Sequence, residues 1–253
     1  MPILDTLRQH ARHAAERASV PFSRTPVGVA LLLSDGAVVT GARVESASFP
    51  LSIPALQAAW TRSRIAGRTD VTAVAASRPL APGELGFLSE SSRRRWQAKD
   101  AEVATVDGAG LHAPTTGFSP FIDAPEDLLE GALAAARRAH APVSHFPVGC
   151  VMETEGGWVA GANVEHPPDW TRGLCAERVA LASAIAGGAG AITRLWLACP
   201  LAPGATPCGG CRQLLADHAP EAELVIWNGD DPPIRTTPAA LLPGAFSADR
   251  LPS

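Results

Sequence analysis

The sequence contains no tyrosine and only two methionines, and charged residues make up just 18% of its 253 positions. Its hydrophobic fraction of 46% is too high for a disordered chain, and its 23 glycines and 23 prolines follow no repeating triplet, so a collagen-like fibre is not indicated. Five cysteines are too few for a disulfide scaffold, and their number is odd. We therefore expect a globular protein whose cysteines are metal ligands or free thiols.

An excess of basic charge is also missing, because 21 lysines and arginines face 25 aspartates and glutamates, for a net charge of −4. Such a chain has no general attraction for phosphate backbones or anionic membranes. The first five residues, Met-Pro-Ile-Leu-Asp, do not begin a signal peptide, and the apolar runs are shorter than the roughly 20 residues that span a bilayer. We expect a cytoplasmic protein without a polymeric nucleic-acid partner and without membrane association.

The two halves of the chain share short motifs that recur in the same order. The first runs Pro-Phe-Ser-Arg-Thr-Pro-Val-Gly and returns as Pro-Val-Ser-His-Phe-Pro-Val-Gly, the second is Gly-Ala-x-Val-Glu, and the third is Pro-Leu-Ala-Pro-Gly. Their offset is 120 or 121 residues, from 21–28 to 142–149, from 41–45 to 161–165, and from 79–83 to 200–204. Three matches in one order indicate a duplicated unit.

The duplication divides the chain into two homologous domains. We place them at residues 1–106 and 125–253, with a linker at 107–124 that is rich in Gly, Pro, Thr and Ser. Each unit shows a helical pattern, a β-hairpin, a second helix, a buried strand, a third helix and a further strand. Alternating strands and helices predict an α/β fold, here a three-layer α/β/α domain present twice.

A metal-binding pattern is found in the second unit. Cys208-Gly-Gly-Cys211 is a Cys-x-x-Cys pair, and Cys175 lies 33 positions before it, with Glu177 two residues further on. Zn²⁺ with three protein ligands keeps a fourth position for water, which is typical of catalytic sites. A structural site completed by Cys199 is the alternative.

Four motifs of the second unit resemble those of the cytidine deaminases, a family of zinc-dependent nucleoside deaminases. They are Phe-Pro-Val-Gly at 146–149, Gly-Ala-Asn-Val-Glu at 161–165, Cys-Ala-Glu-Arg at 175–178 and Pro-Cys-Gly-Gly-Cys-Arg-Gln at 207–213. The closing segment at 241–246 is also similar, whereas the loop at 166–172, His-Pro-Pro-Asp-Trp-Thr-Arg, departs from the family pattern.

The resemblance implies a role for each motif residue. Glu177 would move protons from water to ring N3 and to the leaving amine, as base and then as acid. Without the resemblance, Glu177 is interpreted as a charge at a helix N-terminus. Asn163 and Glu165 are then part of a turn, and Phe146 is an ordinary core residue. The other implied residues are Cys175, Cys208 and Cys211 as Zn²⁺ ligands, Phe146 against the pyrimidine, Asn163 and Glu165 at the ribose, Ala176 at the substrate, and Arg178 and Arg212 as hydrogen-bond donors to sulfur.

The first unit resembles the same family but has lost the ligands. Aligned on the repeat, Cys175 and Glu177 are matched by Pro54 and Leu56, and Cys208 and Cys211 by serines at 89 and 92. We expect one Zn²⁺ per chain, in the C-terminal domain alone, and a non-catalytic N-terminal domain. The basic run at 93–95 is interpreted as a solvated helix face rather than an RNA contact.

The family resemblance also implies an assembly. Single-unit relatives form tetramers with shared sites, so a duplicated chain is expected to form a homodimer that mimics such a tetramer. Phe246 and, from the first unit, Phe49 are candidates for closing a pocket across the interface.

The function implied is hydrolytic deamination of cytidine and deoxycytidine in pyrimidine salvage, with a pyrimidine nucleoside and water as substrates. The unusual loop at 166–172 leaves open an N4-substituted cytidine or a blasticidin-like nucleoside. A non-catalytic protein that binds zinc and a nucleoside is the alternative from another class.

Overall fold

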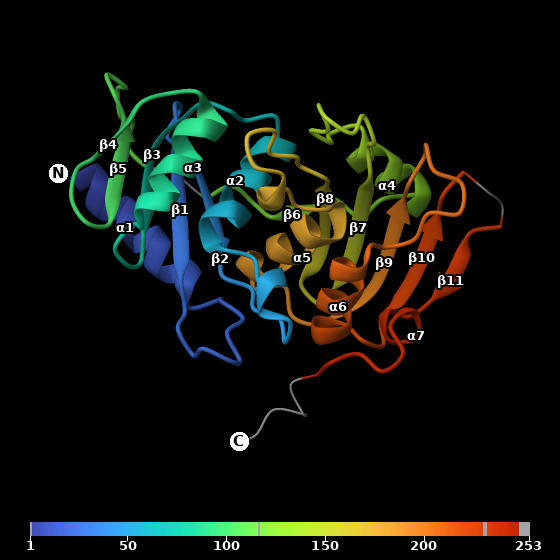
Figure 1. Ribbon diagram of the computed structural model, residues 1–253. Coiled ribbons are helices and arrows are strands. Elements are labelled where there is room, and N and C mark those ends of the chain that lie inside the picture. The colour runs from blue at the N-terminus through green and yellow to red at the C-terminus, as the bar shows by residue number, and fades with distance from the viewer. Residues whose placement is uncertain (1, 116, 230–231, 248–253) are drawn as a thin grey trace.

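The computed structural model describes residues 2–115, 117–229 and 232–247 and contains two β-sheets, each with helices on both faces (Figure 1). The predicted three-layer α/β/α arrangement, present twice, is confirmed. None of the helices in these ranges is long and apolar enough to cross a membrane.

The first unit forms a five-stranded sheet in the order β2-β1-β3-β5-β4, with every neighbouring pair antiparallel. Helix α1 packs on one face, and α2 and α3 cover the other. The elements are α1 (Pro2–Ala15), β1 (Gly28–Leu33), β2 (Val38–Ala42), the 3-10 helix η1 (Phe49–Leu51), α2 (Ala55–Ile65), β3 (Val71–Ala76), α3 (Pro82–Ser92), β4 (Trp96–Ala98) and β5 (Val103–Val106).

The second unit forms a six-stranded sheet in the order β11-β10-β9-β7-β8-β6, in which β10 runs parallel to β9. Helix α4 packs on one face, and α5 and α6 cover the other. The elements are β6 (Phe121–Ile122), α4 (Leu128–Ala136), β7 (Gly149–Thr154), β8 (Gly157–Ala162), the 3-10 helix η2 (Trp170–Arg172), α5 (Ala176–Gly187), β9 (Ile192–Ala198), α6 (Gly209–His218), β10 (Glu223–Trp227), β11 (Ile234–Thr236) and α7 (Pro238–Leu241).

The two units diverge after their third strand. Helix α3 begins at Pro82, inside the repeated Pro-Leu-Ala-Pro-Gly motif, whereas α6 begins only at Gly209, after a loop. The predicted match of Ser89 and Ser92 with Cys208 and Cys211 is therefore wrong in space: both serines lie in the second half of α3, while Cys208 caps the start of α6. The first unit then returns through the hairpin of β4 and β5 instead of a parallel strand.

The interpretation of residues 93–95 as a helix face is also wrong. Helix α3 ends at Ser92, and Arg93 is its C-cap in the left-handed conformation, with φ of 54°. The next two arginines belong to the connection to β4. Arginines at a helix C-terminus interact favourably with its dipole, which suits their placement there.

Glycines let the helices lie directly on the strands. A Cβ atom at Gly161 of β8 would lie 2.3 Å from the Ala176 carbonyl oxygen at the start of α5, and one at Gly149 would lie 2.0 Å from the Ala132 carbonyl oxygen of α4. The first unit repeats both close approaches, at Gly41 and Gly28. The backbone of α5 is thus held against the sheet at its first turn.

The two units share a core along α2 and α5, which lie between the sheets (Figure 1). Val44, Ile53 and Ala58 of the first unit are buried together with the second unit's core residues. The segment predicted as a linker takes part in both sheets, because the Phe118 N–H donates to the Val38 carbonyl over 2.7 Å and β6 pairs with β8.

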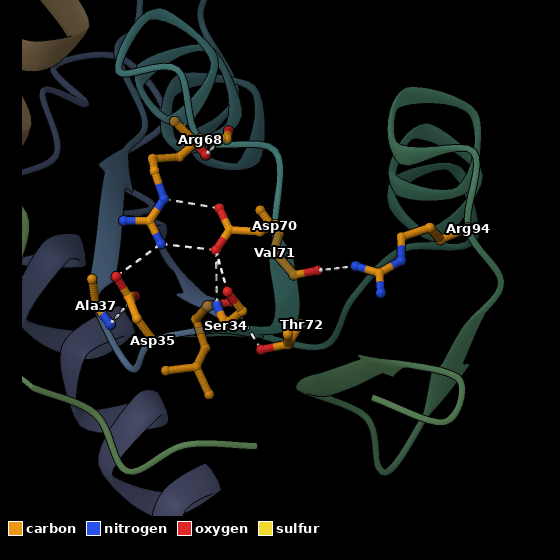
Figure 2. Close-up of polar contacts among 10 residues, drawn as sticks. Ser34, Asp35, Ala37, Arg68, Asp70, Val71, Thr72 and Arg94 are labelled. Atoms are coloured by element: carbon orange, nitrogen blue, oxygen red, sulfur yellow. Dashed lines mark hydrogen bonds and ion pairs between the residues drawn. The ribbon is translucent and has the colours of Figure 1, made fainter. Parts of the chain in front are cut away.

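An ion-pair cluster links the β1–β2 turn to the start of β3 (Figure 2). Arg68 donates to both carboxylate oxygens of Asp70 over 2.8 Å, and its guanidinium also lies 3.0 Å from an Asp35 carboxylate oxygen. Ser34 donates to Asp70 through its backbone N–H and its hydroxyl. The hydrogen bond from Arg68, above all, holds the pKa of Asp70 well below its ordinary value of 3.8.

We predict that Asp70→Asn lowers the stability of the fold in a pH-dependent way. A depressed folded-state pKa stabilises the protein above the unfolded-state pKa, and that stabilisation is lost as the pH falls through the folded-state value. Because the pair is partly exposed, the loss at neutral pH should be about 1 kcal/mol or less. Thermal unfolding should show a lower Tm for the variant at pH 7, and the gap should shrink below pH 3.8. Asp123→Asn, at an exposed position, is the control, and an equal effect there would contradict the assignment.

Candidate metal centre

Three cysteine thiols converge where two helices begin. Cys175 is the N-cap of α5, Cys208 is the N-cap of α6, and Cys211 lies in the first turn of α6. Their sulfur atoms lie within 4.8 Å of one another, and the Cys175 and Cys208 sulfurs are 3.8 Å apart. Thiolates placed tetrahedrally at about 2.3 Å from Zn²⁺ are separated by about 3.8 Å, so this donor set fits the ion.

Hydrogen bonding among the thiols polarises the cluster. Hydrogen bonds with Cys175 and Cys211 lower the pKa of Cys208, and hydrogen bonds with Cys175 and Cys208 raise the pKa of Cys211. The hydrogen bond to Cys208 raises the pKa of Cys175 to about 12. Cys208 is therefore the preferred thiolate, and the dipoles of α5 and α6 favour negative charge at this point. A bound divalent cation would displace the protons of the other two thiols.

Glu177 lies in the first turn of α5, two residues after Cys175, and its side chain is 4% exposed. Burial, as the leading cause, raises the pKa of Glu177 to about 7. The carboxylate is thus placed beside the thiols and away from bulk water.

A cavity of about 360 Å³ opens beside the thiols and brings together half of the twelve predicted site residues. The predicted residues in its lining are Phe146, Asn163, Glu165, Cys175, Glu177 and Cys208. Trp170, from the loop at 166–172, and Cys199, the alternative fourth ligand, also line the cavity. The sequence interpretation assigned no site role to the polar lining residues Ser144 and Thr206. Of these, Ser144 carried a signal, since it belongs to the motif that recurs from the first unit.

Asn163 and Glu165 hold the loop that precedes β7. The Asn163 side chain accepts from the Val148 N–H over 2.8 Å and donates to the Phe146 carbonyl over 2.9 Å. The Glu165 carboxylate accepts from the Val143 N–H over 2.8 Å and from the Ser144 N–H and hydroxyl. These bonds fix the position of Phe146 at the cavity.

The first unit keeps the carboxylate half of this arrangement. Glu45 accepts from the Phe22 and Ser23 N–H groups over 3.1 and 3.0 Å and from the Ser23 hydroxyl. These hydrogen bonds are present in the first unit, which lacks the cysteines. Glu45 and Glu165 therefore anchor the loop independently of any metal. The aligned position of Asn163 is Arg43, which donates to the Thr25 carbonyl instead.

The two arginines expected at the sulfurs bind backbone groups. Arg178 donates to the Leu51 carbonyl over 2.8 Å, and its Nε atom is buried without a hydrogen-bond partner among the described residues. Arg212 donates to the Pro207 carbonyl over 2.7 Å and to the Leu241 carbonyl over 3.2 Å. Arg212 therefore fixes the residue that directly precedes Cys208.

The remaining predicted residues lie away from the cavity. Ala176 is fully buried under the first turn of α5, and neither Phe49, in η1, nor Phe246, near the C-terminus, is part of the described cavity lining. Phe49 is 84% exposed and Phe246 is 46% exposed.

The fold is an α/β domain present in two copies, the second of which carries the thiol cluster, and comparison with known proteins agrees. The sequence pattern of the "Cytidine and deoxycytidylate deaminase zinc-binding region" matches residues 3–77 and again 123–226. The chain therefore belongs to the cytidine deaminase family, with a duplicated deaminase region. Among the described residues, the group of three that could hold a metal lies in the second copy.

Individual relatives align with about half of this chain. A cytidine deaminase from Sporosarcina psychrophila is 34% identical over 128 residues, which are 50% of this chain and 93% of that protein. A cytidine deaminase from Mycobacterium tuberculosis is 38% identical over 131 residues, 50% of this chain and 92% of that protein. A crystal structure of cytidine deaminase from Burkholderia pseudomallei, 36% identical, covers 47% of this chain and 96% of that chain, with a TM-score of 0.43.

We predict that Cys175→Ala, Cys208→Ala and Cys211→Ala each reduce the zinc content of the purified protein at least tenfold, because removing one thiolate leaves an incomplete donor set. Mass-spectrometric metal analysis measures this directly. Cys199→Ala is the matched control, since Cys199 lines the same cavity outside the thiol cluster. Loss of zinc from Cys199→Ala would instead indicate a structural four-cysteine site.

Proposed function

We propose that the C-terminal domain, residues 125–253, catalyses hydrolytic deamination of cytidine and deoxycytidine to uridine and deoxyuridine. The observation that carries the proposal is the buried Glu177 carboxylate in a cavity of about 360 Å³ beside three convergent thiols. The cytidine deaminases among the relatives support the substrate class. A role in cytoplasmic pyrimidine salvage follows from that substrate.

The chemistry divides between the metal and this chain's own groups. Cys175, Cys208 and Cys211 would hold Zn²⁺, which would supply Lewis-acid activation of water. Glu177 would accept a proton from the attacking water and donate it to ring N3 of the substrate. It would then take the proton of the new hydroxyl group at C4 and give it to the departing amine, so that the C4–N bond breaks as the C4 carbonyl forms. Its burial directs these transfers to the substrate instead of to solvent. One water is consumed and one ammonia is released.

The loop-anchoring residues retain capacity for the ribose. The Asn163 amide has used one lone pair of its oxygen and one of its two N–H bonds, and the Glu165 carboxylate can accept further hydrogen bonds. We propose that both bind ribose hydroxyls while Phe146 packs against the pyrimidine. A loop already held by these side chains presents a preorganised site.

The N-terminal domain, residues 1–106, is proposed to be non-catalytic, with one Zn²⁺ per chain. Pro54 caps α2 as Cys175 caps α5, so the ligand position holds no donor, and Leu56 stands where the second unit has Glu177. This domain braces the catalytic one: the Leu51 carbonyl binds Arg178, and the Ser46 hydroxyl donates to the Asp217 carboxylate of α6 over 2.6 Å.

An N4-substituted cytidine or a blasticidin-like nucleoside is the alternative substrate. Trp170, from the loop that departs from the family pattern, lines the cavity and is 60% exposed. An exposed aromatic side chain at the cavity would pack against a group on N4 that is larger than hydrogen. Comparing ammonia release from cytidine, deoxycytidine and N4-methylcytidine distinguishes these substrates.

We predict that Glu177→Gln lowers kcat at least a thousandfold without loss of zinc, because the amide cannot accept the proton. Ultraviolet loss of cytidine measures turnover, and metal analysis of the same sample measures zinc. Glu126→Gln, at an exposed position, should behave as wild type. Full activity of Glu177→Gln would contradict the mechanism, and a wild-type protein with zinc but without turnover would favour the non-catalytic binder.

We also propose a homodimer that mimics a tetramer of single units, with Phe49 and Phe246 at the interface. The exposure of Phe49 and Phe246 supports their burial in an assembly. We predict that light scattering gives twice the mass of a 26.2 kDa chain and that Phe49→Ala weakens association or raises KM. A stable, fully active monomer would contradict the shared site.

A further inference from the structure

A second cavity, of about 630 Å³, lies between the two units. Helix α2 and the residues at and after the end of α3 form its first-unit wall, and His140 with the segment Val164–Pro168 forms much of the other. Its volume is in the range of small-molecule sites. Neither the thiols nor Glu177 is part of its lining, so it is separate from the metal centre.

Three arginines of the first unit line this cavity without a carboxylate partner in the described structure. The Arg64 guanidinium lies 3.0 Å from the His140 ring nitrogens, and Arg94 donates one N–H to the Val71 carbonyl over 3.2 Å (Figure 2). Arg93 is held at the C-cap of α3 in the left-handed region, which is unfavourable for a residue with a Cβ atom. No ion pair within 4.0 Å links any of the three to an acid in the described ranges.

Burial makes the charge of Arg64 costly. Its side chain is half-buried, and desolvation lowers its pKa, yet a guanidinium stays protonated under physiological conditions. A half-buried cation without an anionic partner is stabilised when an anion binds beside it.

The two acids of the cavity lining, Glu165 and Glu90, form no ion pair within 4.0 Å with these arginines. Glu165 accepts hydrogen bonds from the loop at 143–144, and Glu90 lies 3.5 Å from the buried His166 ring. A fourth lining arginine, Arg172, is paired with Asp169 over 2.8 Å. With Arg172 paired to Asp169, the three arginines of the first unit exceed the two glutamates of the lining by one, so the cavity keeps a net positive charge.

We propose that this inter-unit cavity binds a small phosphate-bearing molecule, with Arg64, Arg93 and Arg94 as its ligands. Arginine forks match the oxygens of a phosphate group in paired hydrogen bonds. The ligand would lie behind Val164 and Glu165, which line both cavities. The anion site thus shares a wall with the nucleoside cavity but none of its metal ligands.

Inorganic phosphate is the probe for this site, titrated into the full-length protein by isothermal calorimetry at constant ionic strength. We expect one phosphate per chain, with Arg64→Gln and the double variant Arg93→Gln/Arg94→Gln each weakening the affinity at least tenfold. Arg95→Gln is the matched control, because Arg95 is exposed and outside the cavity lining. Thermal unfolding without phosphate shows whether each variant is folded. If Arg64→Gln does not fold, the double variant Arg93→Gln/Arg94→Gln still tests the proposal, because Arg93 and Arg94 are exposed.

Three results would overturn the proposal: no phosphate binding, equal weakening by Arg95→Gln, or displacement of phosphate by cytidine, which would place the anion in the nucleoside cavity. Tighter binding of a single-stranded RNA that depends on Arg95 would also overturn it, by placing the interaction on the surface. Calorimetry requires no turnover, so this test and that of deaminase activity fail independently.

Discussion

The close seating of α5 on β8 is the constraint on which the metal centre depends. Since Gly161 has no Cβ, the Ala176 carbonyl can lie directly against strand β8. This contact fixes the distance from the sheet of the two residues on either side of Ala176. Cys175 and Glu177 are these neighbours. The parallel pairing of β9 and β10 places α6 alongside α5, so its first turn brings Cys208 and Cys211 to the same point.

The first unit repeats this architecture and uses it differently. Gly41 again admits a close helix, and Glu45 again anchors the preceding loop, but Pro54 at the helix cap offers no ligand. The first unit instead supports the second, because the Leu51 carbonyl of η1 accepts a hydrogen bond from Arg178 of the second unit. Retention of this packing explains why both copies keep their glycines.

The sequence interpretation succeeded where local pattern decides structure and was wrong where connectivity decides it. The capping positions of Cys175 and Cys208 followed from short motifs at loop-to-helix junctions. The serines at 89 and 92 and the arginines at 93–95 were misplaced, because the alignment assumed that both units continue alike after the third strand. Helix α3 instead begins at Pro82, which moves all of these residues to its far end.

By itself, the sequence determined that the chain is duplicated, that each copy folds as an α/β domain of the same family, and that the cysteine motif typical of zinc ligands lies in its second half. These are properties of spacing and residue type. Only the tertiary structure decided that Asn163 and Glu165 anchor the loop of Phe146, that Arg212 fixes Pro207, and that arginines of one unit face His140 of the other. Such contacts join distant segments, and their partners are set by strand order and helix placement, which no local spacing encodes.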